Sequence, residues 1–251
     1  MTTIPWKRAI VVGASSGIGG AIARRLAAGG CQTALVARRA SELNALRDAL
    51  NGEAGIDVAF AYPHDVTDTE EVAALFARIT QELGGLDLIV YASGLMPAVG
   101  PQEYSTEKDA NMIEVNVTGA VAWLNEAASR FGKAKAGTIV GISSVAGERG
   151  RTTSPVYGAT KAFLNTYLEA LRNRIARHGV KVVTVKPGPV KTPMTQGLGK
   201  MPFMISVDEA ADTILAAAAQ GVDVVFVPGK WRLIMTIIRA IPSPIFRYLN
   251  I

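Results

Sequence analysis

The chain has 251 residues, of which 49% are hydrophobic and 19% are charged. This length suits one α/β domain, the apolar fraction excludes a disordered chain, and 25 glycines without a fixed period exclude collagen. The single cysteine, Cys31, excludes an internal disulfide, and two histidines are too few for a site of several imidazoles, so we expect no metal centre.

The net charge of +5 is concentrated at the C-terminal end. Residues 229–251 hold four Lys or Arg residues and no acid, which leaves +1 for the other 228 residues. No basic stripe runs through the rest of the chain, so we expect no nucleic-acid partner. The first residues lack the apolar segment of a signal peptide, and no apolar run approaches the length of a membrane span. We therefore expect a cytoplasmic protein.

Strand-like and helix-like patterns alternate along the chain. The predicted strands are 9–13, 32–37, 57–61, 86–91, 138–142, 180–186 and 222–227. The predicted helices are 18–29, 41–50, 69–83, about 107–131, 156–178 and 207–220, the last with a capping box from Ser206 to Glu209. Several strands are apolar on both faces, as a parallel strand covered on both sides requires. We predict an α/β fold with a single Rossmann-type doubly wound parallel seven-stranded sheet, helices on both faces and an apolar C-terminal helical tail.

A glycine-rich turn follows the first predicted strand. Its spacing is G-x-x-x-G-x-G, and it consists of Gly13, Ser15, Ser16, Gly17, Ile18 and Gly19 together with Ala14. Glycines between a strand and a helix allow a tight turn, close backbone contact with a pyrophosphate and binding of its charge at the helix N-terminus. A purely structural turn could use the same glycines, but their place after the first strand of a parallel sheet favours dinucleotide binding.

Two arginines, Arg38 and Arg39, follow the second predicted strand, where an acid would bind the ribose hydroxyl of NAD. One interpretation is a solvated pair at the start of a helix. Cations there oppose the helix dipole, which favours an anionic partner. The pair therefore indicates the 2′-phosphate of NADP.

The sharpest pattern is Tyr157-x-x-x-Lys161, because a spacing of four places phenol and ammonium on one helical face. A free tyrosine has a pKa of about 10, and a nearby cation lowers that pKa and so makes the phenol a proton donor or acceptor. Ser144 follows the fifth predicted strand and can hydrogen-bond a substrate carbonyl from the same sheet edge. Alone, the pattern could equally be a partly buried tyrosine beside a surface lysine.

The chain resembles the short-chain dehydrogenase/reductase family from residue 9 to about residue 227. The motifs that carry the resemblance are Gly13-x-x-x-Gly17-x-Gly19, Asp65-Val66, Asn116, Ser144, Tyr157-x-x-x-Lys161 and Pro187-Gly188 with Thr192. The resemblance implies hydride transfer between NADP(H) and a carbonyl or secondary alcohol, in a homodimer or homotetramer.

Carried over position by position, the resemblance also implies a role for each residue. Tyr157 is the acid/base, Lys161 binds the nicotinamide ribose and lowers the pKa of Tyr157, and Ser144 polarises the substrate oxygen. Asn116 holds a water of the proton relay. Asp65 and Val66 contact adenine, and the segment that contains Pro187, Gly188, Val190 and Thr192 surrounds the nicotinamide carboxamide.

One segment departs from the family pattern. After the fourth strand the family usually has Asn-Asn-Ala-Gly, whereas this chain has Tyr91-Ala92-Ser93-Gly94. Gly94 still permits close approach of the cofactor, and we expect Tyr91 to pack against a neighbouring strand. Other tempting residues have simpler interpretations: we expect His64 at the rim of the site, His178 as a helix-end cation and Cys31 as a buried filler.

Two segments bear on the substrate. Residues 193–205 are rich in methionine and form a predicted substrate lid for an apolar ketone, or else a cover for the core. In the tail, Trp231, Ile234, Met235, Ile238 and Ile241 share one helical face, and Pro242 and Pro244 are expected to end that helix. Such a helix suits a subunit contact or pocket flap, with an anionic membrane surface at 230–251 as the alternative. The tail also resembles reductases of lipid-linked keto-sugars and the apolar ends of hydroxysteroid dehydrogenases.

These observations predict an NADP-binding domain over residues 1–228, which includes the lid, and an amphipathic extension over 229–251. The expected activity is NADPH-dependent reduction of a hydrophobic or lipid-linked ketone, with Tyr157 as proton donor. The alternative is a non-catalytic NADP sensor or scaffold docked at the membrane surface. Ser144, Tyr157 and Lys161 argue against it, because a scaffold has no need for all three together.

Overall fold

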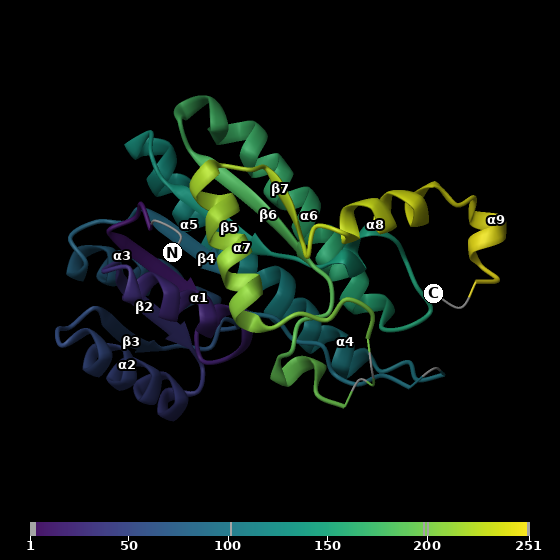
Figure 1. Cartoon of the computed structure of the whole chain (residues 1–251), viewed down its shortest axis with the longest axis horizontal. Helices are drawn as coiled ribbons and strands as arrows, with labels where there is room; N and C mark the ends of the chain where they lie inside the picture. Colours follow the sequence, from purple (N-terminus) through teal and green to yellow (C-terminus); the bar gives the residue numbers. More distant parts are fainter. Residues whose placement is uncertain (1–3, 101, 198, 200, 250–251) are drawn as a thin grey trace.

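The computed structural model describes residues 4–100, 102–197, 199 and 201–249 of the chain. Within them, seven strands form one parallel sheet in the order β3-β2-β1-β4-β5-β6-β7 (Figure 1). The strands are β1 Arg8–Val12, β2 Gln32–Ala37, β3 Ala59–Pro63, β4 Leu88–Tyr91, β5 Thr138–Ile142, β6 Lys181–Pro187 and β7 Val224–Val227. The predicted doubly wound parallel sheet is confirmed, although β3 begins two residues later than the pattern indicated.

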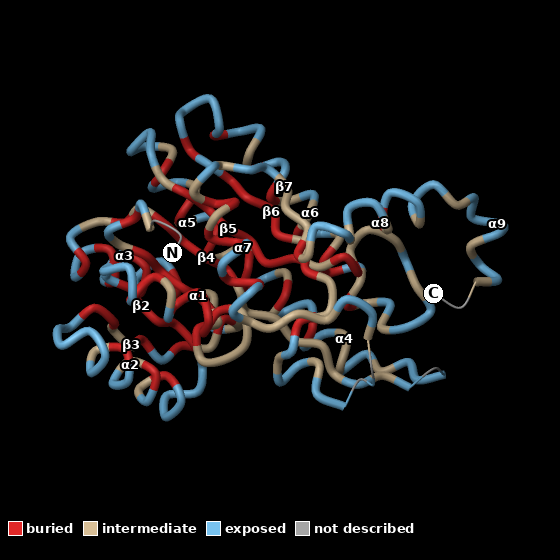
Figure 2. Tube along the Cα trace, in the orientation of Figure 1, coloured by how far each residue is buried: buried red, intermediate tan, exposed pale blue. Residues whose placement is uncertain are grey.

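Helices cover both faces of the sheet, so the protein has three layers. One face packs against α1 Gly17–Ala28, α2 Ala40–Ala54 and α7 Val207–Gln220. The other packs against α3 Thr69–Glu82, α5 Gly119–Ala134 and α6 Pro155–Ile175. Neighbouring residues of β1 point into different cores, Val11 into the first and Ile10 into the second. The buried segments in Figure 2 follow the strands for this reason.

The helix predicted over about 107–131 is interrupted, which corrects the sequence prediction. It consists of α4 Thr106–Ile113, a π-helical turn η1 Glu114–Thr118, and α5. The hydroxyl of Tyr91 donates a hydrogen bond to the Val115 carbonyl at 2.8 Å, so Tyr91 bonds to this turn as well as lying in the sheet. The π-helical turn spans five residues within a longer helical run, which is too short a stretch for its different period to stand out in the sequence pattern.

Short helices and caps complete the body of the fold. The 3-10 turns are η2 Val145–Glu148, η3 Ala176–His178 and η4 Pro193–Thr195. The predicted capping box is present at the start of α7: the Glu209 amide donates to the Ser206 hydroxyl at 3.1 Å, and the Ser206 amide donates to the Glu209 carboxylate at 2.9 Å. Cys31 is buried and free.

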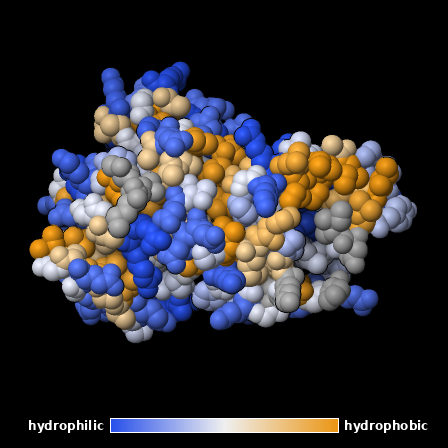
Figure 3. Space-filling view, viewed as in Figure 1, coloured by the Kyte–Doolittle hydropathy of each residue, from blue (hydrophilic) through white to orange (hydrophobic). Residues whose placement is uncertain are grey.

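The C-terminal tail forms α8 Trp231–Ala240 and α9 Ser243–Phe246, which extend from one end of the body (Figure 1). α8 ends at Ala240, just before Pro242, so the predicted break in the tail helix is present, and Pro244 lies in the first turn of α9, where proline is well tolerated. Met235 is buried, whereas Leu233 and Ile237 are 68% and 58% exposed. Apolar side chains gather over this end of the molecule in Figure 3. No helix among the described residues is long and apolar enough to cross a membrane.

Candidate active site

The carboxyl ends of the central strands open into a cavity of about 770 Å³. Most of the predicted site residues line it: Gly13, Ser15, Ser16, Gly17, Ile18, Gly19, Arg38, Arg39, Asp65, Val66, Gly94, Ser144, Tyr157, Lys161, Pro187, Gly188, Val190 and Thr192. Asn116 lies just behind the wall, between the lining residues Val115 and Gly94. A larger hollow of about 1270 Å³ lies at the opposite end of the strands, and none of the predicted site residues lines it.

The turn from β1 to α1 leaves no room for side chains at two of its glycines. A Cβ atom on Gly13 would lie 2.5 Å from the Ser93 amide nitrogen, and one on Gly19 would lie 2.2 Å from the Gly13 carbonyl oxygen. Gly17 has φ +58° and faces Thr192. The Ser16 side chain makes no cap hydrogen bond, and the first turn of α1 holds no acid. The positive end of α1 is thus left to bind an anion.

Arg38 and Arg39 extend over this turn from the end of β2. The Arg39 guanidinium donates to the hydroxyls of Ser15 at 3.0 Å and Ser16 at 3.2 Å. Arg38 donates to the Asp65 carboxylate at 3.3 Å. Burial acts to raise the pKa of Asp65, but the hydrogen bonds it accepts, including the one from Arg38, outweigh burial and lower that pKa. Arg39 also pairs with the Glu42 carboxylate at 3.2 Å, so two guanidinium groups stand beside the glycine turn, each with one carboxylate partner.

Tyr157 and Lys161 lie one turn apart near the start of α6, and both are buried and line the cavity. The Lys161 ammonium donates to the Ile142 carbonyl at 3.0 Å and lies 5.8 Å from the centroid of the Tyr157 ring. Burial lowers the pKa of Lys161 to about 8. Ser144 follows the end of β5, and its hydroxyl accepts a hydrogen bond from the Ala146 amide at 3.1 Å.

The pKa of Tyr157 differs from the sequence-based expectation. In the protein alone, burial raises this pKa; a hydrogen bond with the Ser144 side chain and the charge of Arg151 oppose the rise. The Lys161 ammonium is directed to the Ile142 carbonyl. Arg151, a residue that the family motifs did not include, is a cation whose charge acts to lower the pKa of Tyr157.

Asn116 acts as a clamp in the π-helical turn. Its amide oxygen accepts from the Leu95 amide at 2.7 Å, and its amide nitrogen donates to the Leu95 carbonyl at 2.9 Å and the Thr160 hydroxyl at 3.1 Å. Thr160 in turn donates to the Tyr157 carbonyl at 2.8 Å. Both N–H donors of the Asn116 side chain are thus used within the protein, so this side chain ties the segment after β4 to the helix that carries Tyr157.

His64, expected at the rim of the site, borders the cavity and is buried. Its ring packs edge-on against Trp123 with 5.7 Å between centroids. Burial lowers its pKa, and nearby acids, first among them Asp68, oppose that shift. His64 follows the end of β3, and its side chain points inward toward α5. Beyond the end of a strand, the spacing of residues in the sequence does not predict this direction.

The tail supplies a wall of the cavity that the sequence did not reveal. A Cβ atom on Gly188 would lie 2.0 Å from the indole nitrogen of Trp231, so the indole packs directly on that backbone. Phe203 of the predicted lid packs edge-on against Trp231 with 6.2 Å between centroids. Met194 and Met201 of the lid also line the cavity, whereas Leu198 and Lys200 lie outside the described residues.

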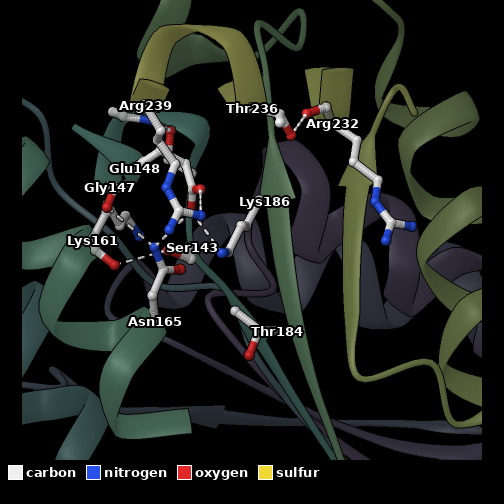
Figure 4. Close-up of polar contacts among 12 residues, drawn as sticks. Ser143, Gly147, Glu148, Lys161, Asn165, Thr184, Lys186, Arg232, Thr236 and Arg239 are labelled. Atoms are coloured by element: carbon white, nitrogen blue, oxygen red, sulfur yellow. Dashed lines mark hydrogen bonds and ion pairs between the residues drawn. The ribbon is translucent and has the colours of Figure 1, made fainter. Parts of the chain in front are cut away.

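Figure 4 shows the contacts that hold α8 against the body. Glu148, at the end of η2, pairs with Lys186 of β6 at 2.6 Å and with Arg239 of α8 at 3.3 Å. We call Glu148, Lys186 and Arg239 the Glu148 cluster. Beside it, Arg149 donates to three carbonyls at the end of α8, at distances of 2.8, 3.0 and 2.6 Å. The segment after Ser144 and the C-terminal helix are therefore held together by charge.

A parallel sheet with an anion-binding turn and a nucleotide-sized cavity at the carboxyl ends of its strands defines the class of Rossmann-type α/β enzymes. The family model described as short chain dehydrogenase matches residues 7–202 of the chain. The chain belongs to the short-chain dehydrogenase/reductase family and is an oxidoreductase.

Individual relatives agree with this assignment. An uncharacterized oxidoreductase from Myxococcus xanthus is 33% identical over 247 residues, which cover 98% of this chain and 97% of the relative. An uncharacterized oxidoreductase from Staphylococcus epidermidis is 35% identical over 197 residues, 78% of this chain and 84% of the relative.

Two solved structures with NADPH share the fold. The short-chain dehydrogenase from Sphingobium yanoikuyae has a TM-score of 0.81 and 27% identity, and the match covers 94% of this chain and 96% of that one. A variant of the actinorhodin polyketide ketoreductase has a TM-score of 0.80 and 27% identity, and covers 92% of this chain and 99% of that one.

Proposed function

We propose that the protein reduces a hydrophobic or lipid-linked ketone to a secondary alcohol with NADPH. The observation that carries the proposal is that Ser144, Tyr157 and Lys161 line the same cavity as the glycine turn of β1 and α1. A proton donor, a hydrogen-bond donor for the carbonyl oxygen and an anion-binding turn within one cavity are what carbonyl reduction requires.

The residues of the cavity fit the phosphorylated cofactor. The close backbone approach at Gly13 and Gly19 and the uncapped start of α1 suit a pyrophosphate. Arg38 and Arg39 are suited to a 2′-phosphate, because guanidinium groups bind phosphate in a bidentate manner. We further infer that Asp65 and Val66 contact adenine and that the segment from Pro187 to Thr192 holds the nicotinamide. When bound, NADPH supplies the hydride that reduces the carbonyl carbon.

The side chains of the site have separate roles in the proposed reaction. Tyr157 gives its phenolic proton to the carbonyl oxygen, and its raised pKa keeps that proton in place at neutral pH. Ser144 donates a hydrogen bond to the same oxygen and stabilises the charge that develops there. Lys161, whose ammonium faces the Gly94 backbone, binds the nicotinamide ribose. Asn116 positions Tyr157 through Thr160, and we assign it this positioning role beside the proton relay.

The apolar substrate is inferred from the side chains opposite the glycine turn. Leu95, Met96, Val145, Met194 and Met201 line that end of the cavity. Aliphatic side chains and flexible thioethers favour an apolar ligand of irregular shape. A lipid-linked substrate also suits the exposed apolar side chains of α8 beside the cavity.

The test is NADPH oxidation by the purified protein with a panel of aliphatic, aromatic and long-chain ketones. Reduction of at least one apolar ketone, lost in Tyr157→Phe, supports the proposal. Tight NADPH binding without oxidation by any ketone of the panel would favour the alternative, a non-catalytic NADP sensor or scaffold.

The outer face of the tail carries a second proposal. Leu233, Ile237, Ile245 and Tyr248 are exposed on α8 and α9 beside four cations of the same segment. We infer that residues 229–251 form a separate extension whose outer face contacts a second copy of this chain in a homo-oligomer. The alternative partner is the anionic cytoplasmic surface of a membrane. Sedimentation of the full chain, with and without vesicles containing phosphatidylglycerol, separates the two partners.

A further inference from the structure

The segment after Ser144 carries three charged side chains in four residues, and two of them have structural partners. Glu148 is held by Lys186 and Arg239, as Figure 4 shows. Arg149 caps the end of α8 and lies 4.0 Å above the centroid of the Phe246 ring. Both charged side chains, Glu148 and Arg149, therefore have a structural role in holding the tail.

The third residue, Arg151, has no such explanation. Its side chain makes no ion pair or hydrogen bond to any other residue that the structure describes, and it lines the active-site cavity. Its charge reaches the phenol of Tyr157, whose pKa it acts to lower. Arg151 therefore stands near the reacting end of the cavity with its donors available.

The acids of the cavity are placed elsewhere. Among the described lining residues, the carboxylates are Asp65 and Glu114. Asp65 already pairs with Arg38 beside the glycine turn, and Glu114 is exposed on the π-helical turn. Among the described residues, neither of these carboxylates forms an ion pair with Arg151, although all three side chains line the same cavity.

We propose that Arg151 binds an anionic group, a carboxylate or a phosphoryl group, on the ketone that this enzyme reduces. A guanidinium presents a planar set of donors that matches either group, and inside a partly closed cavity such a hydrogen-bonded charge pair is stronger than in water. The substrate is thus an amphiphile: an apolar body against the methionines and an anion at Arg151. This inference rests on the proposed function and adds the charge of the substrate to it.

The experiment compares ketones that carry an anionic group with neutral partners. The probes are 5-oxohexanoate with its methyl ester, and dihydroxyacetone phosphate with dihydroxyacetone, so that the carboxylate and the phosphate are tested separately. The proteins are the full-length wild type, Arg151→Gln and a matched control, Arg177→Gln, which changes an exposed arginine beyond the end of α6. We measure kcat and KM from NADPH oxidation, and the Kd by calorimetry on the NADPH complex of Tyr157→Phe, with and without Arg151→Gln.

We expect at least one anionic probe to bind about tenfold to a hundredfold tighter than its neutral partner. Arg151→Gln removes that preference, measured as the ratio of the Kd and KM values of each charged probe to those of its neutral partner, and Arg177→Gln retains it. No preference for either anion, or a preference that survives Arg151→Gln, overturns the inference. Binding preference without any NADPH oxidation would instead refute the reductase and leave the anion site standing.

Discussion

Replacing Glu148 with Gln tests whether charge holds the tail to the body. The Glu148 side chain is 4% exposed, the Lys186 side chain 12% and the Arg239 side chain 63%. Glu148→Gln keeps the shape of the side chain but removes its charge. The ammonium of Lys186 is then left in a mostly buried position without a countercharge.

The magnitude follows from the two pairs separately. Removing one partner of a buried ion pair costs about 3–5 kcal/mol, because the remaining charge stays desolvated. The exposed pair with Arg239 contributes at most about 1 kcal/mol. Since Lys186 keeps some contact with water, we expect a loss of about 3 kcal/mol in the free energy of unfolding. For a chain of this length, that corresponds to a Tm lower by roughly 6–12 °C.

The assay is urea unfolding at pH 7, with the free energy of unfolding extrapolated to water. Arg239→Gln is the matched control, because it removes the exposed partner and leaves the Glu148–Lys186 pair in place; we expect it to cost about 1 kcal/mol or less. A Glu148→Gln protein within about 1 kcal/mol of wild type would refute the reasoning, since the carboxylate would then not be stabilising Lys186.

Three further predictions concern the cavity. Tyr157→Phe should lower kcat by about a hundredfold to ten-thousandfold while the Kd of NADPH stays unchanged; substantial remaining turnover contradicts the role of the phenol. Arg38→Asp should reduce the preference for NADPH over NADH, measured as the ratio of kcat/KM values, by about tenfold or more, and an unaltered ratio would mean that the 2′-phosphate is bound elsewhere. Burial lowers the pKa of Lys161 in the folded protein to about 8, whereas its pKa in the unfolded chain stays at 10.5. Between pH 8 and pH 10.5 the unfolded state therefore binds more protons than the folded state. The measurement is the free energy of unfolding of wild type and of Lys161→Met from pH 7 to pH 10. We expect the wild type to gain stability relative to the variant as the pH rises. A constant difference between the two would show that the pKa of Lys161 is not depressed.

Local patterns were enough to predict much of this fold. Apolar runs such as the one around Val183 mark parallel strands because both of their faces must be buried. The hydroxyl of Ser206 and the carboxylate three residues later mark a helix start through bonds made within a single turn. Likewise, the shared helical face of Tyr157 and Lys161 follows from the pitch of α6 alone.

The features that the sequence did not predict depend on contacts between distant segments. The π-helical turn is coupled to Tyr91, which lies 24 residues away from its bonding partner Val115. The Trp231 indole, at the first residue of α8, packs on the backbone of Gly188 at the end of a distant strand. The direction of the pKa shift of Tyr157 depends on how deeply α6 is buried and on the position of Arg151. Periodicity carries no information about any of these contacts.

The wall that Trp231 forms on the cavity has a consequence for the order in which the protein is made. The whole parallel sheet precedes residue 231, so the ribosome completes the nucleotide-binding framework before it adds the side chain that encloses the pocket. A transcript shortened near its end would thus encode a sheet that retains its phosphate-binding turn. The cavity would then be open where Trp231 forms a wall in the full-length enzyme. Damage at the end of the coding region would in this way fall first on the cavity wall that Trp231 forms.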